Sequence, residues 1–249
     1  MATSPNIVQA SALGRRVRNE DRVEHWVGAE AALLAVADGL GGHSHGELAA
    51  QMAIDMLGAA FERNARAKLA EPSPFLSETF GAAHRAIVEE ARRRSLPDNP
   101  RTVMVACIVQ DGHAFAAHVG DCRFYLIRHG RIAVRTRDHT VVQRLVDEGR
   151  IREEAVSSHP YRNRLLHCLG GIETPPVEAA PPVRLAEGDV LLLCSDGFWG
   201  PLSPRQMIHA LLARPLAQAI PELVALAEKQ AGLDCDNISV VAMTWNPTA

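Results

Sequence analysis

Four aspartates stand beside apolar runs that have the length of buried strands. Asp38 follows LLAVA, Asp121 follows AAHVG and Asp196 follows LLLCS, whereas Asp236 precedes NISVVAM. A carboxylate at the edge of an apolar core loses its charge or costs considerable free energy unless a positive group lies close. Because the chain contains only two lysines, a divalent cation is the natural counter-charge. Carboxylate, carbonyl and water ligands favour Mg²⁺ or Mn²⁺.

Each of these aspartates, taken alone, also suits an exposed turn, because Asp-Gly is a frequent turn dipeptide. Asp38 and Asp196 both precede glycine, which lets the backbone turn tightly and lets a carbonyl oxygen approach the same ion. Before the first expected strand, the segment GRRVRNEDRV adds Arg16, Glu20 and Asp21. The combination of separate carboxylates with an arginine cluster favours a cation site over a set of unrelated turns.

The elements that must position these side chains follow from hydrophobic periodicity. Apolar runs and alternation predict strands at 22–27, 31–37, 101–109, 113–119, 122–128, 131–135, 190–195 and 237–244. Helical spacing predicts helices at 46–69, 75–94, 140–148, 204–213 and 217–230, and a Pro-rich connector spans 174–182. Strands and helices come in blocks rather than in strict alternation, so we expect antiparallel sheets covered by helices, not a doubly wound parallel sheet.

The composition is that of an ordinary globular protein. Of the 249 residues, 47% are apolar and 22% are charged, which excludes a disordered charged tail and a coiled coil. The 26 Lys and Arg residues against 29 Asp and Glu residues give a formal charge of −3. The basic excess that nucleic-acid binding requires is therefore lacking, and we expect no nucleic acid partner.

A membrane span and secretion are not expected either. The longest apolar runs, 31–37 and 103–109, are seven residues each, against the roughly 20 that a bilayer requires. The first fifteen residues lack an early positive charge and the apolar stretch of a signal peptide. The five cysteines are odd in number and scattered, which is typical of reduced thiols in the cytoplasm.

Seven ordered motifs resemble those of one family. They are GRRVRNED, AVADGLGGHSHGE, HVGDCRFYLIRHG, TRDHT, HPYRNRLLHCLG, GDVLLLCSDGFW and DCDNISVV, and they resemble the metal-dependent protein phosphatases, the PPM or protein phosphatase 2C family, in its bacterial form. The resemblance runs from about residue 14 to 241. It implies an α+β fold of two stacked antiparallel β-sheets flanked by α-helices on both sides. It also implies a single phosphatase domain over 1–249, with a flap segment at about 150–165.

The resemblance further implies a site with two metal ions and a third, looser ion. The residues expected at the ions are Asp21, Asp38, Gly39, Asp121, Asp196 and Asp236. Within this set Gly39 contributes its carbonyl, Asp21 acts through water and Asp121 belongs to the third ion. Arg16 matches the arginine that grips the phosphoryl group, for which its planar fork is suited. His43 matches the position proposed to assist protonation of the leaving alcohol.

The chemistry of such a site fits the hydrolysis of a phosphate monoester. That reaction is among the slowest in water, with enzymes supplying up to about 10²¹-fold, whereas general acid or base catalysis supplies roughly 10² to 10⁴. Metal ions must account for much of the rest, by activating a bridging water and offsetting phosphoryl charge. We expect a cytoplasmic serine/threonine phosphoprotein phosphatase requiring Mn²⁺ or Mg²⁺, which acts on Ser/Thr-phosphorylated proteins, a cognate bacterial kinase or its substrates among them.

Other functions fit the same residues less well. A relative that keeps the fold and binds a phosphoprotein or kinase without hydrolysis is the main alternative, although every matched aspartate is present. A dinucleotide-binding loop at 38–46 lacks the third glycine and has Asp38 where pyrophosphate would sit. The HSH sequence at 43–45 lacks the spacing of a zinc motif. Cys122 replaces the family's usual serine beside Asp121, which puts the affinity of the third ion in doubt and suggests sensitivity to oxidation.

Overall fold

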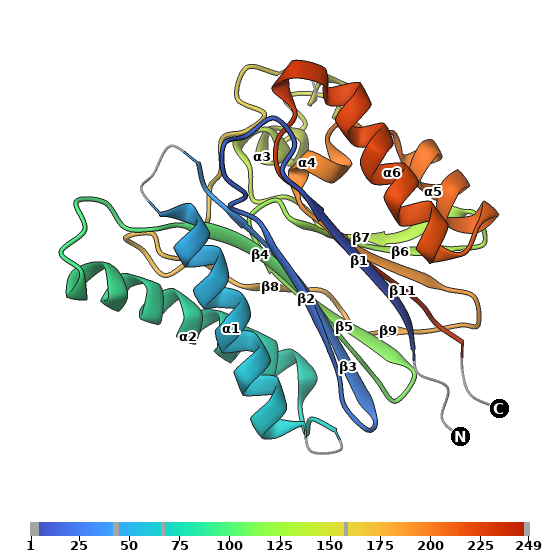
Figure 1. Ribbon diagram of the computed structural model, residues 1–249, viewed down its shortest axis with the longest axis horizontal. Coiled ribbons are helices and arrows are strands. Elements are labelled where there is room, and N and C mark those ends of the chain that lie inside the picture. Colours follow the sequence, from blue (N-terminus) through green and yellow to red (C-terminus); the bar gives the residue numbers. More distant parts are fainter. Residues whose placement is uncertain (1–4, 42–44, 66–67, 157–158, 247–249) are drawn as a thin grey trace.

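The computed structural model describes residues 5–41, 45–65, 68–156 and 159–246. Their strands form two antiparallel sheets (Figure 1). The first has the order β1-β11-β10-β6-β7, with β1 Asn6–Ala12, β6 Arg123–Arg128, β7 Arg131–Arg135, β10 Val190–Cys194 and β11 Ile238–Thr244. The second has the order β2-β3-β4-β5-β8, with β2 Arg22–Val27, β3 Ala31–Gly39, β4 Thr102–Gln110, β5 His113–Val119 and β8 Glu178–Ala179. Strand β9, Val183–Arg184, also pairs with β5.

Helices cover the outer face of each sheet (Figure 1). The second sheet is covered by α1, Gly46–Asn64, and α2, Pro72–Arg93, and the first by α5, Pro204–Ala213, and α6, Leu216–Ala231. The connections contain α3, Val141–Asp147, α4, Asp196–Trp199, and the short 3₁₀ helices Glu153–Ala155 and Gly232–Asp234. Among the described helices, none combines the length and apolar composition that a bilayer crossing requires.

The packing of strand β3 shows why its sequence is apolar at every position from Ala31 to Ala37. Leu33 and Ala35 pack into the cluster formed with α1 and α2, whereas Leu34 and Val36 pack into the cluster between the two sheets. Successive side chains of a strand point to opposite faces, so a strand covered on both sides has no position for a polar residue. The α-β-β-α sandwich is thus confirmed, and its central core is the contact between the sheets.

The predicted elements are largely confirmed, with differences at their ends. The predicted strands occur with ends that differ from the prediction by at most two residues, and β3 extends through Asp38 to Gly39. The helix predicted over 46–69 ends earlier, at Asn64. Its end is displaced because the backbone of Leu69 bonds to the side chain of Gln110 at the end of β4, through an N–H donated at 2.7 Å and a carbonyl accepting at 2.9 Å.

Strand β1 is missing from the prediction. Its sequence NIVQASA has few strongly apolar residues, and its side chains are at best half-buried. It forms because β11 supplies hydrogen-bonding partners along its whole length, and pairing across most of the chain length is not visible in local periodicity. The Pro-rich connector predicted over 174–182 likewise contains β8, which pairs with β5.

Two glycines inside helices predict opposite effects of substitution to alanine. A Cβ at Gly58 in α1 would lie 2.3 Å from the Trp26 ring, whereas at Gly81 in α2 the nearest atom is the flexible end of Arg85 at 3.4 Å. Gly58→Ala should lower the free energy of unfolding by about 1–3 kcal/mol, whereas Gly81→Ala should raise it by about 0.5–1 kcal/mol. Urea unfolding of both variants measures the difference; changes of the same sign would contradict the packing described for α1.

Candidate active site

The strand connectivity brings the candidate carboxylates to one end of the sandwich. Asp38 lies at the end of β3 and Asp121 follows β5, which runs parallel to β3 because each pairs antiparallel with β4. Asp21 precedes β2, the antiparallel partner of β3. In the first sheet, Asp196 follows β10 and Asp236 precedes its antiparallel partner β11. Ends and beginnings of antiparallel neighbours coincide, so these five side chains meet although they are far apart in sequence.

A pocket of about 1000 Å³ opens at this end of the sandwich. The predicted residues that line it are Arg16, Asp38, Gly39, Asp121, Asp196 and Asp236. Asp21 lies behind them, with 3% of its surface exposed. His43 lies outside the described residues. The structure therefore brings together all the predicted site residues that it describes, and their roles as ligands stay a prediction.

The carboxylates on the floor of the pocket are crowded. Asp38 and Asp196 lie close enough for each carboxyl group to affect the ionisation of the other. Burial, and then repulsion from Asp236, raises the pKa of Asp196 to about 6. Burial, and then repulsion from neighbouring carboxylates, raises the pKa values of Asp38 and Asp121 well above their usual range. Like charges held this close disfavour their own ionisation, so the floor is a strong binding site for positive charge.

Asp21 is held by Ser195, which the sequence analysis did not assign to the site. The Ser195 hydroxyl donates to Oδ2 of Asp21 at 2.8 Å, and the Ser239 N–H donates to the Ser195 oxygen at 3.0 Å. Burial, the largest cause, raises the pKa of Asp21 to about 7, and the Asp196 carboxylate contributes to the rise. Ser195 thus connects β10, β11 and the segment before β2, and it orients Asp21 toward the other carboxylates.

The loop that contains Arg16 is anchored by Asn237. The Asn237 side chain accepts the Glu20 N–H at 2.8 Å and donates to the carbonyl oxygens of Leu13 and Arg18 at 2.9 and 3.0 Å. Arg16 itself donates to Oδ2 of Asp236 at 2.7 Å and keeps 54% of its side chain exposed. This places a partly free guanidinium directly at the edge of the carboxylate floor.

Glu20 was noted in the sequence beside Asp21 but was not assigned a role at the ions. It lines the pocket, and its Oε2 atom is buried without a hydrogen-bond partner in the described structure. Burial raises its pKa, and Glu47 raises it further. An orphaned carboxylate oxygen beside a floor of carboxylates fits divalent cations, which prefer oxygen ligands. The signal that could have identified it is its place directly before Asp21 in the NED sequence.

The structure contradicts the expectation that Cys122 is sensitive to oxidation. Its side chain is fully buried in the core between the sheets. Burial, and then the nearby Asp38 and Asp121 carboxylates, raises the pKa of the thiol well above its usual value. A buried thiol that does not ionise is inert, so that expectation is wrong. All five cysteines lie in described residues, and none forms a disulfide.

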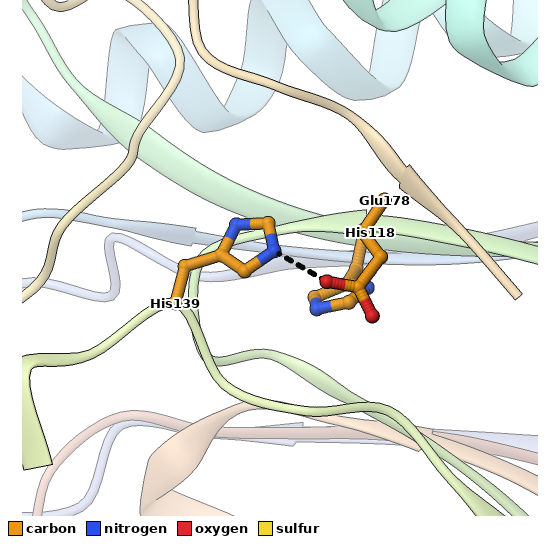
Figure 2. Close-up of side chains that lie close together, drawn as sticks. All are labelled: His118, His139 and Glu178. Atoms are coloured by element: carbon orange, nitrogen blue, oxygen red, sulfur yellow. Dashed lines mark hydrogen bonds and ion pairs between the residues drawn. The ribbon is translucent and has the colours of Figure 1, made fainter. Parts of the chain in front are cut away.

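Two histidines and a glutamate lie beside the backbone of Asp121. Figure 2 shows His118 of β5, His139 and Glu178 of β8 with their side chains together. The donor set could hold a metal ion by composition, but the hydrogen bonds oppose it. Nδ1 of His139 accepts the Gly120 N–H at 3.2 Å, so the proton of the neutral ring lies on Nε2, which faces Glu178 at 3.3 Å. That nitrogen then has no lone pair to offer an ion.

The role that these contacts support is to fix Gly120 and therefore Asp121. The His139 N–H also donates to the Gly120 carbonyl at 2.9 Å, and Gly120 has φ of +99°, which favours glycine. Next to this clamp, Arg123 donates twice to Asp138, at 2.8 and 2.7 Å. The strand end that carries Asp121 is thus tied on both sides to the segment before α3.

Comparison with known proteins agrees with this geometry. Stacked antiparallel sheets whose strand ends gather carboxylates around one pocket define the class of the metal-dependent phosphatases. A family model described as Protein phosphatase 2C matches residues 8–231. The chain belongs to the protein phosphatase 2C family.

The most similar relatives include bacterial phosphatases. The chain is 36% identical over 230 residues to the serine/threonine protein phosphatase PstP of Mycobacterium tuberculosis, covering 91% of this chain but 42% of that protein, so it spans less than half the length of this relative. It is 30% identical to the protein phosphatase PhpP of Streptococcus pneumoniae, covering 92% of this chain and 93% of the relative.

Solved structures show the same likeness. The crystal structure of M. tuberculosis PstP/Ppp is 33% identical, with a TM-score of 0.84 over 97% of this chain and 98% of that one. A structure of the catalytic domain of PstP in complex with two manganese ions is 32% identical, with a TM-score of 0.79 over 96% of each chain.

The raised pKa values predict how the metal-free protein responds to pH. Groups whose pKa is raised on folding bind more protons in the folded state, so their contribution to stability is lost as pH rises from about 4 to about 7. In EDTA, Asp196→Asn should therefore raise the free energy of unfolding at pH 7.5 by on the order of 2 kcal/mol, with little effect at pH 4. Urea unfolding at both pH values measures this. Asp98→Asn, at an exposed position, is the control; an equal effect of Asp196→Asn at both pH values would contradict the repulsion.

The clamp on Gly120 predicts a local loss of protection. His139→Ala removes the acceptor of the buried Gly120 N–H and should lower the free energy of unfolding by about 1–3 kcal/mol. Hydrogen exchange at the Gly120 amide should accelerate more than exchange in α6. His209→Ala, at an exposed position on α5, should change neither quantity. An unchanged Gly120 exchange rate in His139→Ala would show that the hydrogen bond does not hold this strand end.

Proposed function

We propose that this chain is a cytoplasmic serine/threonine phosphoprotein phosphatase that requires Mn²⁺ or Mg²⁺. The observation that carries the proposal is the packing of the Asp38, Asp121, Asp196 and Asp236 carboxyl groups around one pocket at the same end of the sandwich. Acidic groups packed in this way need a bound positive charge at neutral pH. The relatives named as serine/threonine phosphatases, one of them crystallised with two manganese ions, support the same reading.

The residues of the chain divide into those that hold cations and those that hold substrate. Asp38, Asp196 and Asp236, with the Gly39 carbonyl and Asp21 through water, would hold two ions, and Asp121 a third. When bound, such ions supply an activated water and offset the charge of the phosphoryl oxygens. The chain's side chains then orient and bind, and no side-chain nucleophile is required.

Arg16 is placed to bind the phosphoryl group of the substrate. Its guanidinium reaches Asp236 at the edge of the floor and is more than half exposed. A planar fork with several N–H donors can exchange one carboxylate for two phosphoryl oxygens. Protonation of the leaving serine or threonine alcohol is assigned to His43, in keeping with the position of this residue in the family motif.

The partners proposed are Ser/Thr-phosphorylated proteins, including a cognate bacterial kinase or its substrates. The pocket is open at the surface, and the segment at 150–165, proposed as a flap, contributes Asn163 and Arg164 to its wall. A non-catalytic binding function would be expected to lack one of the floor carboxylates, and each of them is present. The structure therefore favours catalysis over this alternative.

The proposal predicts metal-dependent turnover that requires the floor carboxylates. Purified protein should hydrolyse an aryl phosphate in Mn²⁺ and stop in EDTA. Asp38→Asn and Asp196→Asn should each lower kcat by about 100-fold or more, because each variant removes a ligand charge, while circular dichroism shows an intact fold. Arg16→Ala should mainly raise KM. Asp98→Asn serves as the exposed control. Turnover in EDTA would exclude the mechanism, and a folded, Mn²⁺-bound protein without turnover would favour the non-catalytic alternative.

A further inference from the structure

We propose that the arginines around the mouth of the pocket select phosphorylated segments that carry a second anionic group close to the phosphoryl group. The inference rests on the proposed function and names the class of substrate that this site prefers. The residues concerned are Arg15, Arg18 and Arg164, which line the pocket but are separate from the phosphoryl-binding Arg16.

The floor and the mouth of the pocket carry opposite charges. Its floor is acidic and buried, with 7% of Asp121 exposed and Asp21 behind it. Its mouth is basic and exposed, and 73% of the Arg18 side chain is in contact with solvent. Once cations balance the floor, the net charge of the mouth is positive, although the whole chain has a formal charge of −3. The arginines at the mouth therefore give the entrance a positive charge that the chain as a whole does not have.

These guanidinium groups are largely uncommitted. Arg18 lies 3.8 Å from Glu47, at the long end of an ion pair. Among the residues that the structure describes, no carboxylate lies within 4.0 Å of the Arg15 or Arg164 guanidinium. The Arg164 guanidinium carbon lies over the Tyr161 ring, 5.9 Å from its centre. Exposed arginines without an internal partner are available to a ligand at little cost in lost contacts.

The backbone segments that carry the arginines are fixed by hydrogen bonds. The Arg15 N–H donates to the Cys235 carbonyl at 2.9 Å, and the Arg18 carbonyl accepts from Asn237. In the second segment that lines the pocket, the Arg164 carbonyl accepts the Val141 N–H at 2.8 Å. Two anchored backbone segments thus carry arginines at the same pocket, which favours recognition of a ligand with two anionic groups.

Arginine suits this task because its fork binds carboxylate and phosphate groups in the same geometry. The second anionic group could be an aspartate or glutamate side chain, or a second phosphorylated residue. A segment rich in lysine or arginine would instead place like charges against the mouth. We therefore expect the site to discriminate between phosphorylated segments by the residues that flank the phosphorylated one. Arg16 and the floor, which hold the phosphoryl group, do not make this distinction.

The test compares peptides that share one phosphothreonine and differ in their flanks. Glutamate flanks, glutamine flanks, lysine flanks and a second phosphoserine form the four arms, and kcat/KM is measured in Mn²⁺ at low and high salt. We expect the glutamate and phosphoserine peptides to exceed the lysine peptide by about three- to tenfold, with the ratio shrinking at high salt. If kcat/KM differs between the glutamate and phosphoserine peptides, the better substrate identifies which anionic group the site prefers.

Two variants test whether the arginines at the mouth cause the preference for acidic peptides. The Arg18→Gln Arg164→Gln double variant should bring the ratio of acidic to basic peptides to within about twofold, and Arg205→Gln on α5, which lies outside the pocket lining, should leave it unchanged. Equal kcat/KM for acidic and basic peptides in the unmodified protein overturns the inference, even if aryl phosphate is hydrolysed. If aryl phosphate is not hydrolysed, the proposed function fails, and fluorescence anisotropy of the same peptides decides the inference: equal affinities overturn it.

Discussion

Mutual repulsion among carboxylates held at the edge of an apolar core is the constraint on which the rest of this structure depends. Asp38 and Asp196 line the floor of the same pocket, and Asp21 and Asp121 are buried beside them. The surrounding contacts keep these groups together against their own charge. Ser195 holds Asp21, the His139 clamp holds the backbone before Asp121, and Asn237 holds the loop before Asp21. The fold supplies a rigid frame whose negative charge requires cations for its neutralisation.

Much of this arrangement was predictable from the sequence because apolar runs stop at the residues that matter. The run before Asp38 is uninterrupted since β3 is covered on both faces, and the same holds for β10 before Asp196. The motifs indicated the family, and the fold of that family predicted two stacked sheets flanked by helices. Strand β1 was not predictable, because its partner β11 lies at the far end of the chain and its own side chains are only half-buried.

The supporting residues escaped prediction for a related reason. Ser195, Glu20 and His139 have ordinary residue types for their positions, and what they do depends on contacts across many residues. Ser195 reaches Asp21 over 174 positions of sequence and Asn237 reaches Glu20 over 217. The comparisons place the chain in its family, whereas these contacts are visible only in the structure.

The place of β11 has a consequence for how the protein is made. This strand follows the other described elements in the chain, yet it lies inside the first sheet between β1 and β10, with Asp236 and Asn237 directly before it. A nascent chain that has not yet released this strand from the ribosome has a split sheet, an unanchored arginine loop and an incomplete carboxylate floor. The site is therefore complete only after β11 has been synthesised, and a fragment that ends before residue 236 lacks both Asp236 and Asn237.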